Sequence, residues 1–317
     1  MNNYKKTNSA IWSGRTSNDQ LYLHEKIKCI DLENEKIPDN QGKAFAILGY
    51  ACEEGVKRNL GRIGAVSGPD QIRKMIAPLS NHFDKETKII DAGTIYCIEN
   101  SLEKTQSITS DKIFQLLNKQ YFNLILGGGH DLAYAHYNGI KKYHPDATIG
   151  IINLDAHFDL RSVNDKGNSG TPFYQISKEN DRFKYLCFGI QEESNNQILF
   201  KTAKQLDVEF LKNTDFKIEN KKAIGSLIDK FIADVDAIYL TIDLDGFSSA
   251  FAPGVSAPSP FGFSTDIALF AIERICNSKK LISADIVELN PKYDLDNITA
   301  KLAARLVYYI IKYISSS

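Results

Sequence analysis

The chain has 317 residues and a formal net charge of −1, with 43% hydrophobic and 24% charged residues, an ordinary globular composition. A chain of this length can bury a sizeable core, and its balanced charge argues against nucleic acid as a partner, because phosphate binding depends on clustered lysine and arginine. No apolar run approaches the ~18 residues that a membrane helix requires, and the polar stretch 1–14 lacks the apolar core of a signal peptide. Five scattered cysteines without paired spacing indicate mostly buried thiols in a reducing cytoplasm.

Residues 1–42 are polar and weakly periodic, and we interpret them as an N-terminal extension to a single catalytic domain over 43–317. From there, short apolar runs alternate with amphipathic stretches. The predicted strands are 44–48, 88–90, 124–126, 148–154, 185–188, 237–242 and 281–286. The predicted helices are 69–77, 111–119, 132–143, 223–233, 265–276 and 298–314. This alternation predicts one α/β domain with a parallel sheet covered by helices.

Candidate metal ligands follow three of the predicted strands, at the carboxyl ends where functional residues of parallel sheets gather. The first segment places a histidine after three glycines. In the second, Asp155, His157 and Asp159 alternate with other residues, as Asp243 and Asp245 do in the third, so each set lies on one face if the chain stays extended. Each segment alone also fits a structural role, namely a glycine turn with a structural histidine or a half-exposed edge strand. The candidate ligands are His130, Asp155, His157, Asp159, Asp243 and Asp245.

If these six side chains converge, their four carboxylates repel one another unless cations balance the charge. Two divalent ions would do so. Imidazole and carboxylate ligands without thiolate favour Mn²⁺, with Zn²⁺, Co²⁺ or Fe²⁺ as alternatives. Two ions ~3.5–4 Å apart can share a water molecule and lower its pKa, so the pattern predicts a two-metal hydrolase.

A fourth segment, 284–291, follows the predicted strand 281–286. Glu288 has no local basic partner there, so it could pair with a cationic group of a substrate, and a structural salt bridge is the alternative. Asp285 fits polar support inside the sheet. His136, in the helix predicted after His130, is also expected to be structural.

In order, the four segments GGGHD, DAHFD, DLDG and DIVELNP resemble the ureohydrolase family of arginases, agmatinases and formimidoylglutamases. The resemblance extends from about Ala44 to the C-terminus. It implies a three-layer α/β/α fold with a mostly parallel eight-stranded sheet, and a dimanganese site held by the six candidate ligands. It also implies that Glu288 grips the amidine or guanidine group. We expect Asp159, both a ligand and a hydrogen-bond acceptor, to relay a proton to the leaving amine.

Three further stretches, 57–73, 169–173 and 252–258, resemble the formimidoylglutamase branch of the family. The sequence also departs from arginase at two places. Ser169-Gly170 stands where arginases and agmatinases carry His-Gly, and Arg161 stands where arginases have a neutral asparagine. The resemblance therefore implies a hydrolase of linear amidines that converts N-formimidoyl-L-glutamate and water to L-glutamate and formamide, a step of histidine degradation.

Arg161 also has a direct physical interpretation. An arginine fork beside a metal site suits a carboxylate, and N-formimidoyl-L-glutamate carries two, whereas the amine of agmatine would be repelled. Arg62 is a second candidate clamp, and a structural salt bridge is the alternative for both arginines. Asn59, Ser169 and Gly170 complete the predicted substrate contacts.

Two other functions stay open at this point. One is a ureohydrolase acting on another guanidino acid, arginine or agmatine. The other is a non-catalytic metal-binding family member, although such a protein would usually lose ligands and all six are present here. In each case we expect a cytoplasmic protein with no nucleic-acid or membrane partner, and the resemblance adds an expectation of homo-oligomers.

Overall fold

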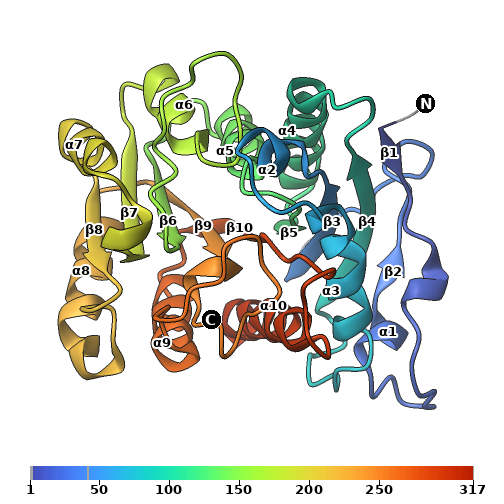
Figure 1. Cartoon of the computed structure of the whole chain (residues 1–317). Coiled ribbons are helices and arrows are strands. Elements are labelled where there is room, and N and C mark those ends of the chain that lie inside the picture. Colours follow the sequence, from blue (N-terminus) through green and yellow to red (C-terminus); the bar gives the residue numbers. More distant parts are fainter. Residues whose placement is uncertain (1–2, 41–42, 317) are drawn as a thin grey trace.

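The computed structural model describes residues 3–40 and 43–316, and its central feature is a ten-stranded sheet in the order β1-β4-β3-β5-β10-β9-β6-β7-β8, with β2 also paired to β4 (Figure 1). The strands are β1 (Tyr4–Lys5), β2 (Lys28–Cys29), β3 (Ala44–Ala51), β4 (Lys88–Tyr96), β5 (Phe122–Leu126), β6 (Ile149–Leu154), β7 (Lys184–Ile190), β8 (Glu209–Lys212), β9 (Ala237–Asp243) and β10 (Leu281–Val287). The α-helices are α1 (Leu23–Lys26), α2 (Glu54–Arg58), α3 (Gly68–Ile76), α4 (Leu102–Asn118), α5 (Leu132–Tyr143), α6 (Pro172–Glu179), α7 (Gln197–Gln205), α8 (Lys221–Ala233), α9 (Thr265–Cys276) and α10 (Ile298–Ser316).

The expected mostly parallel sheet is confirmed, and its strand count needs a correction. All pairings among β3 to β10 are parallel, and these eight strands are the expected sheet. The two extra strands, β1 and β2, come from the N-terminal segment and pair with β4, β1 in the antiparallel direction. Each is two residues long, which is too short to leave a periodic signal in the sequence. The edge strand β8 was also not predicted, because its sequence EFLK is mixed and none of its residues is fully buried.

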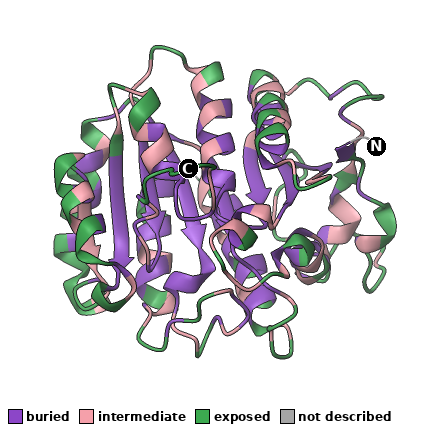
Figure 2. Ribbon diagram, turned by 45° about the horizontal axis from the view of Figure 1, so that its top comes forward, coloured by how far each residue is buried: buried purple, intermediate pink, exposed green. Residues whose placement is uncertain are grey.

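Helices cover both faces of the sheet and make three layers. In Figure 1, α4, α5 and α6 lie above the sheet, while α8, α9 and α10 lie below it. Two separate apolar clusters fill the two interfaces. Alternate residues of β3 enter different clusters, Phe45 and Ile47 in one and Ala46 and Leu48 in the other, as the two-residue period of a strand requires. The strands are accordingly buried on both faces, and exposed residues lie on the outer sides of the helices (Figure 2).

The N-terminal segment 3–40 shares this sheet and core. Trp12 and Leu23 are buried in the same cluster as α3 and α10, and the indole Nε1 of Trp12 donates to Asp91 Oδ2 in β4 at 2.7 Å. The segment 3–40 packs on the rest of the chain through strand pairing as well as through side-chain contacts. The domain boundary at residue 42 therefore stays a prediction. Across the described ranges, no helix is long and apolar enough to cross a membrane.

The strand order determines which candidate functional residues lie close together. Strands β5, β10, β9 and β6 are consecutive neighbours in the sheet. Their carboxyl ends lead into the four segments singled out in the sequence, so residues up to 158 positions apart meet at one edge. This convergence follows from parallel pairing, which puts the ends of neighbouring strands at the same edge.

Candidate metal centre

The turn before His130 is built from glycines because the backbone there passes very close to its neighbours. A Cβ added to Gly128 would lie 1.9 Å from the Cys52 carbonyl oxygen. The next amide, of Gly129, donates to that same oxygen at 3.0 Å. These contacts hold the turn against the end of β3 and place His130 just ahead of α5.

The segment after β6 reaches the site by a different route from the one expected. Strand β6 ends at Leu154, and Asp159 has a φ of 49°, in the left-handed region. The expectation that 155–159 stays extended is therefore wrong. The segment is a loop, and its turn brings the side chains of Asp155, His157 and Asp159 to one site.

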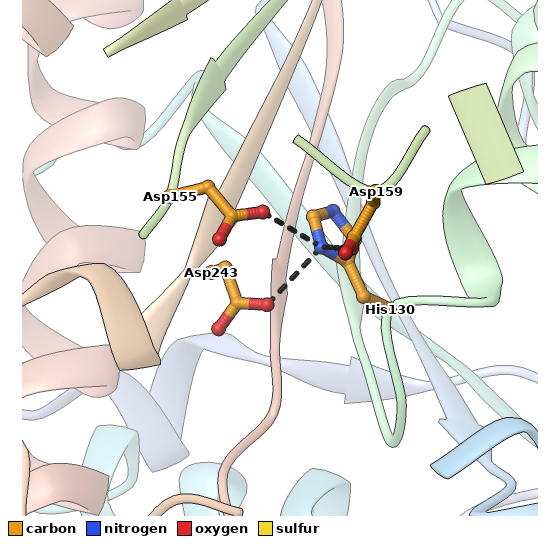
Figure 3. A group of neighbouring side chains, drawn as sticks. All are labelled: His130, Asp155, Asp159 and Asp243. Atoms are coloured by element: carbon orange, nitrogen blue, oxygen red, sulfur yellow. Dashed lines mark ion pairs between the residues drawn. The ribbon is translucent and has the colours of Figure 1, made fainter. Parts of the chain in front are cut away.

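The first group of candidate ligands surrounds one imidazole nitrogen (Figure 3). His130 Nδ1 lies 3.2 Å from Asp155 Oδ2, 2.9 Å from Asp159 Oδ2 and 3.1 Å from Asp243 Oδ2. These residues come from three different strand ends, so the sheet determines their relative placement.

The second group shares one residue with the first. His157 Nδ1 lies 3.5 Å from Asp155 Oδ1 and 3.2 Å from Asp245 Oδ2. Asp245 lies in the 3-10 helix Leu244–Gly246, and its amide donates to Asp243 Oδ1 at 2.8 Å. Because one oxygen of Asp155 faces each group, this carboxylate is placed to bridge two ions.

Two divalent cations fit these residues on three grounds. The ligand atoms of each group lie within 4.8 Å of one another. His130 Nδ1 and Asp245 Oδ1 are buried without a hydrogen-bond partner in the structure, which is costly unless a ligand meets them. Burial raises the pKa of Asp243 well above its usual range, and repulsion from Asp245 and then Asp155 adds to this effect. Imidazole and carboxylate donors suit Mn²⁺ and similar ions.

Buried partners orient His130. Its Nε2 lies 3.0 Å from Thr241 Oγ1, and the Thr241 hydroxyl donates to Asp285 Oδ1 at 2.5 Å. Thr241 must therefore accept from Nε2–H, which leaves the lone pair of Nδ1 directed at the three carboxylates. Asp285 also accepts from the Tyr239 hydroxyl and contacts His136 Nδ1 at 2.6 Å, as expected of polar support inside the sheet.

Glu288 lies beside this centre at the end of β10, with a φ of 68°. Its Oε1 accepts a hydrogen bond from the backbone amide of His130 at 2.8 Å. Burial raises the pKa of Glu288 to about 8, and repulsion from Asp245 contributes as well. A buried carboxylate of this kind favours a cationic partner, which would stabilise its ionised form.

A cavity of about 480 Å³ opens over the site. Its walls join the metal centre to the predicted substrate contacts. The lining includes His130, His157, Asp159, Asp243, Asp245, Glu288, Arg161, Arg62, Asn59 and Ser169. Asp155 lies beneath this surface, fully buried.

The two candidate clamps differ in what their side chains already bind. Arg161 is exposed and forms no ion pair with the described residues, and its backbone amide donates to Gly170 O at 2.9 Å. Arg62 donates from Nε to Ser256 O at 2.8 Å and from Nη2 to Val255 O at 2.5 Å. Its guanidinium also stacks on Tyr293, 4.0 Å from the ring centre. Arg62 is therefore tied to the loop 252–258, while Arg161 is available to a ligand.

Of the remaining predicted contacts, Asn59 and Ser169 line the cavity, whereas Gly170 is not among the lining residues. Asn59 Nδ2 donates to Ser169 Oγ at 3.1 Å, and the Gly170 amide donates to Asn168 Oδ1. Two residues at the site were not predicted from the sequence. Thr241 left a weak signal, a polar residue in an apolar strand two positions before Asp243. Asn195 left no signal in the sequence, because it follows β7 while its side chain binds the loop that follows β6.

Comparison with known proteins identifies the family of the chain. A model of the arginase family matches residues 43–312. The formimidoylglutamase of Chromobacterium violaceum is 40% identical over 308 residues, covering 96% of this chain and 98% of that protein. That of Clostridium tetani is 40% identical over 323 residues, covering 98% of this chain and 96% of that protein.

Solved structures show the same architecture. The formimidoylglutamase structure from Bacillus subtilis superposes with a TM-score of 0.84 at 24% identity, covering 96% of this chain and 95% of that one. The Trypanosoma cruzi formiminoglutamase structure with Mn²⁺ superposes with a TM-score of 0.78 at 25% identity, covering 86% of this chain and 94% of that one. On the match of the family model to residues 43–312 and the identity to relatives over nearly the full length, the chain belongs to the arginase family.

Proposed function

We propose that this protein hydrolyses N-formimidoyl-L-glutamate to L-glutamate and formamide. The observation that carries the proposal is the pairing, in one cavity, of the buried Glu288 carboxylate beside the metal centre with the Arg161 guanidinium, which forms no ion pair with the residues that the structure describes. A substrate with an amidinium at one end and carboxylates at the other matches both. The names of the relatives in C. violaceum and C. tetani support the same substrate.

The six ligands would hold two Mn²⁺ ions, with Asp155 shared between them. When bound, such ions supply Lewis-acid activation of a water molecule and offset negative charge that develops on the substrate. The other contributions come from the side chains around the cavity.

Glu288 would bind and orient the amidinium. Its Oε1 is held by the His130 amide, so Oε2 can accept hydrogen bonds from the substrate nitrogens. The contact fixes the formimidoyl carbon near the metal centre, which lowers the entropic cost of reaction. The cationic substrate in turn favours the ionised form of Glu288.

Asp159 would move the proton. Its Oδ2 faces His130 Nδ1, and the residue lines the cavity, so Oδ1 is the atom we assign to carry a proton to the leaving amine nitrogen. This assignment fits the absence of a His-Gly pair at 169–170, where Ser169 offers a hydroxyl instead of an imidazole.

Arg161 would bind a substrate carboxylate through charge-assisted hydrogen bonds. Asn59, Ser169 and Gly170 would shape the wall behind it, and Arg62 would position the loop 252–258. We further propose a cytoplasmic location and self-association, the latter testable by light scattering of the purified protein.

The test is an assay of the Mn²⁺-loaded protein with N-formimidoyl-L-glutamate, L-arginine, agmatine and guanidino acids side by side. We expect glutamate and formamide from the first compound alone. Urea from arginine, agmatine or a guanidino acid would keep the two-metal chemistry and overturn the substrate. A protein that binds both ions and hydrolyses none of the compounds would favour a non-catalytic role.

A further inference from the structure

Asn195 is a buried side chain that faces both the cavity and the metal-ligand loop. It follows β7 and the 3-10 helix Glu192–Ser194, is 3% exposed and lines the cavity. Its Nδ2 donates to Ala156 O at 2.8 Å and to Gln191 O at 2.7 Å, and its Oδ1 accepts from the Phe158 amide at 3.0 Å. All three bonds are made to backbone.

Two of these bonds flank a metal ligand. Ala156 and Phe158 are the residues on either side of His157, and Phe158 immediately precedes Asp159. Because β6 has ended at Leu154, no strand ladder holds this part of the chain. A further backbone bond at Ala156 comes from the Gln191 amide at 3.0 Å. From β7, the Tyr185 hydroxyl donates to Phe158 O at 3.2 Å and Cys187 Sγ lies 3.7 Å from His157 O. Asn195 adds bonds to the peptide groups on both sides of His157, so the shape of the ligand loop depends on this side chain together with those of β7.

We infer that Asn195 is a positioning residue that holds His157 and Asp159 in the geometry needed to bind two metal ions; this rests on the proposed two-metal function. The side chain must donate and accept at once, which a carboxamide can do. Aspartate in its place would keep the acceptor for Phe158 and lose both donors, and alanine would lose all three bonds. Residues that orient metal ligands typically contribute ~10–100-fold to metal affinity.

The two ion sites should respond unequally. His157 is the one histidine in the group with Asp155 and Asp245, and both of its flanking peptide groups are bound by Asn195. His130, in the other group, is held by the glycine turn and by Thr241. Loss of the Asn195 bonds should therefore weaken the ion in the His157 group more than the ion in the His130 group.

The experiment uses the metal-free full chain and the variants Asn195→Ala and Asn195→Asp. Mn²⁺ binding is titrated by calorimetry and followed by electron paramagnetic resonance, without substrate. The matched control is Asn196→Ala, since Asn196 is the adjacent asparagine and its side chain caps α7 by accepting from Ile198 N and Leu199 N. That variant loses a comparable set of hydrogen bonds away from the ligand loop.

We expect wild type and Asn196→Ala to bind two ions and give the spectrum of a coupled pair. Both Asn195 variants should bind the second ion ~10–100-fold more weakly and give the spectrum of single Mn²⁺ ions at limiting metal. Folded Asn195 variants that bind two ions with wild-type affinity would overturn the inference; if Asn195→Ala fails to fold, the isosteric Asn195→Asp decides. Failure of wild type itself to bind two ions would instead overturn the proposed function.

Discussion

Two clusters of buried charge lie in the molecule, one inside β4 and one at the carboxyl ends of β5, β6 and β9, and they differ in how the charge is neutralised. In the first, the Arg73 cluster, Arg73 and Asp91 are both fully buried. Arg73 donates from Nε and Nη2 to the two oxygens of Asp91 and from Nη1 to Thr94 Oγ1. Trp12 Nε1 and the Thr7 hydroxyl donate to the same carboxylate.

The second cluster is the set of six candidate metal ligands, and it lacks such compensation. Its four carboxylates face two imidazoles, and none of them forms an ion pair with an arginine or lysine among the described residues. His130 Nδ1 and Asp245 Oδ1 have no hydrogen-bond partner within the described ranges 3–40 and 43–316. The contrast teaches that buried charge neutralised by the chain itself serves stability, while buried charge left uncompensated marks the place of a ligand.

The largest effect is expected from Asp159→Asn in the uncompensated cluster. The change removes a proton carrier and weakens a metal ligand, so kcat should fall ~10²–10⁴-fold. The fold should persist, because no strand or helix depends on this side chain. Steady-state kinetics and circular dichroism check both statements, and a near-normal rate would remove Asp159 from the mechanism.

Asp91→Asn, in the Arg73 cluster, should lower stability and leave metal binding unchanged. It removes the buried counter-charge of Arg73 and leaves only the half-exposed Asp70, whose Oδ1 lies 3.2 Å from Arg73 Nη1. The free energy of unfolding should therefore fall by up to about 3–5 kcal/mol. Urea denaturation measures this change. The folded protein should bind Mn²⁺ with wild-type affinity. A large loss of affinity would contradict the separation of the two clusters into one that serves stability and one that binds a ligand.

Arg161→Gln should change recognition without changing the metal centre. Loss of a charged hydrogen-bond donor to a carboxylate costs about 1.5–3 kcal/mol, so kcat/KM for N-formimidoyl-L-glutamate should fall ~10–100-fold. Mn²⁺ stoichiometry should remain two. Arg62→Gln is the comparison variant. The Arg62 guanidinium binds loop carbonyls, so we expect this change also to lower the free energy of unfolding. Equal kcat/KM for wild type and Arg161→Gln would refute the carboxylate contact.

The smallest effect is expected from Trp12→Phe. This variant removes one of several donors to Asp91 while keeping an aromatic ring in the core, so stability should fall by about 1 kcal/mol. Thermal unfolding detects such a change, and kinetic constants should not move. A strong loss of activity would mean that the N-terminal segment acts on the catalytic site.

The convergence of the candidate metal ligands could be predicted from the sequence because parallel strands deliver their carboxyl ends to one edge, whatever the exact strand boundaries. His130, Asp243 and Glu288 needed no more than that rule. That Asp155 faces both groups of candidate ligands could not be predicted, because it depends on which oxygen faces which group. Nor could the role of Asn195, which reaches the ligand loop from another connection.

The fold also has features that could be predicted from the sequence and features that could not. Long apolar strands such as β6 and β9 were predicted, since burial on both faces leaves a continuous apolar run. The strands β1 and β2 and the Arg73 cluster were not, because they rest on contacts between segments far apart in the chain. Thr7 and Asp91, for example, are 84 positions apart.

The central claim is tested most directly by measuring hydrolysis of N-formimidoyl-L-glutamate before and after reconstitution of the metal-stripped protein with Mn²⁺. We predict no turnover without metal, and release of glutamate and formamide in equal amounts once two ions are bound per chain. A protein that binds two ions and leaves this compound intact would contradict the account.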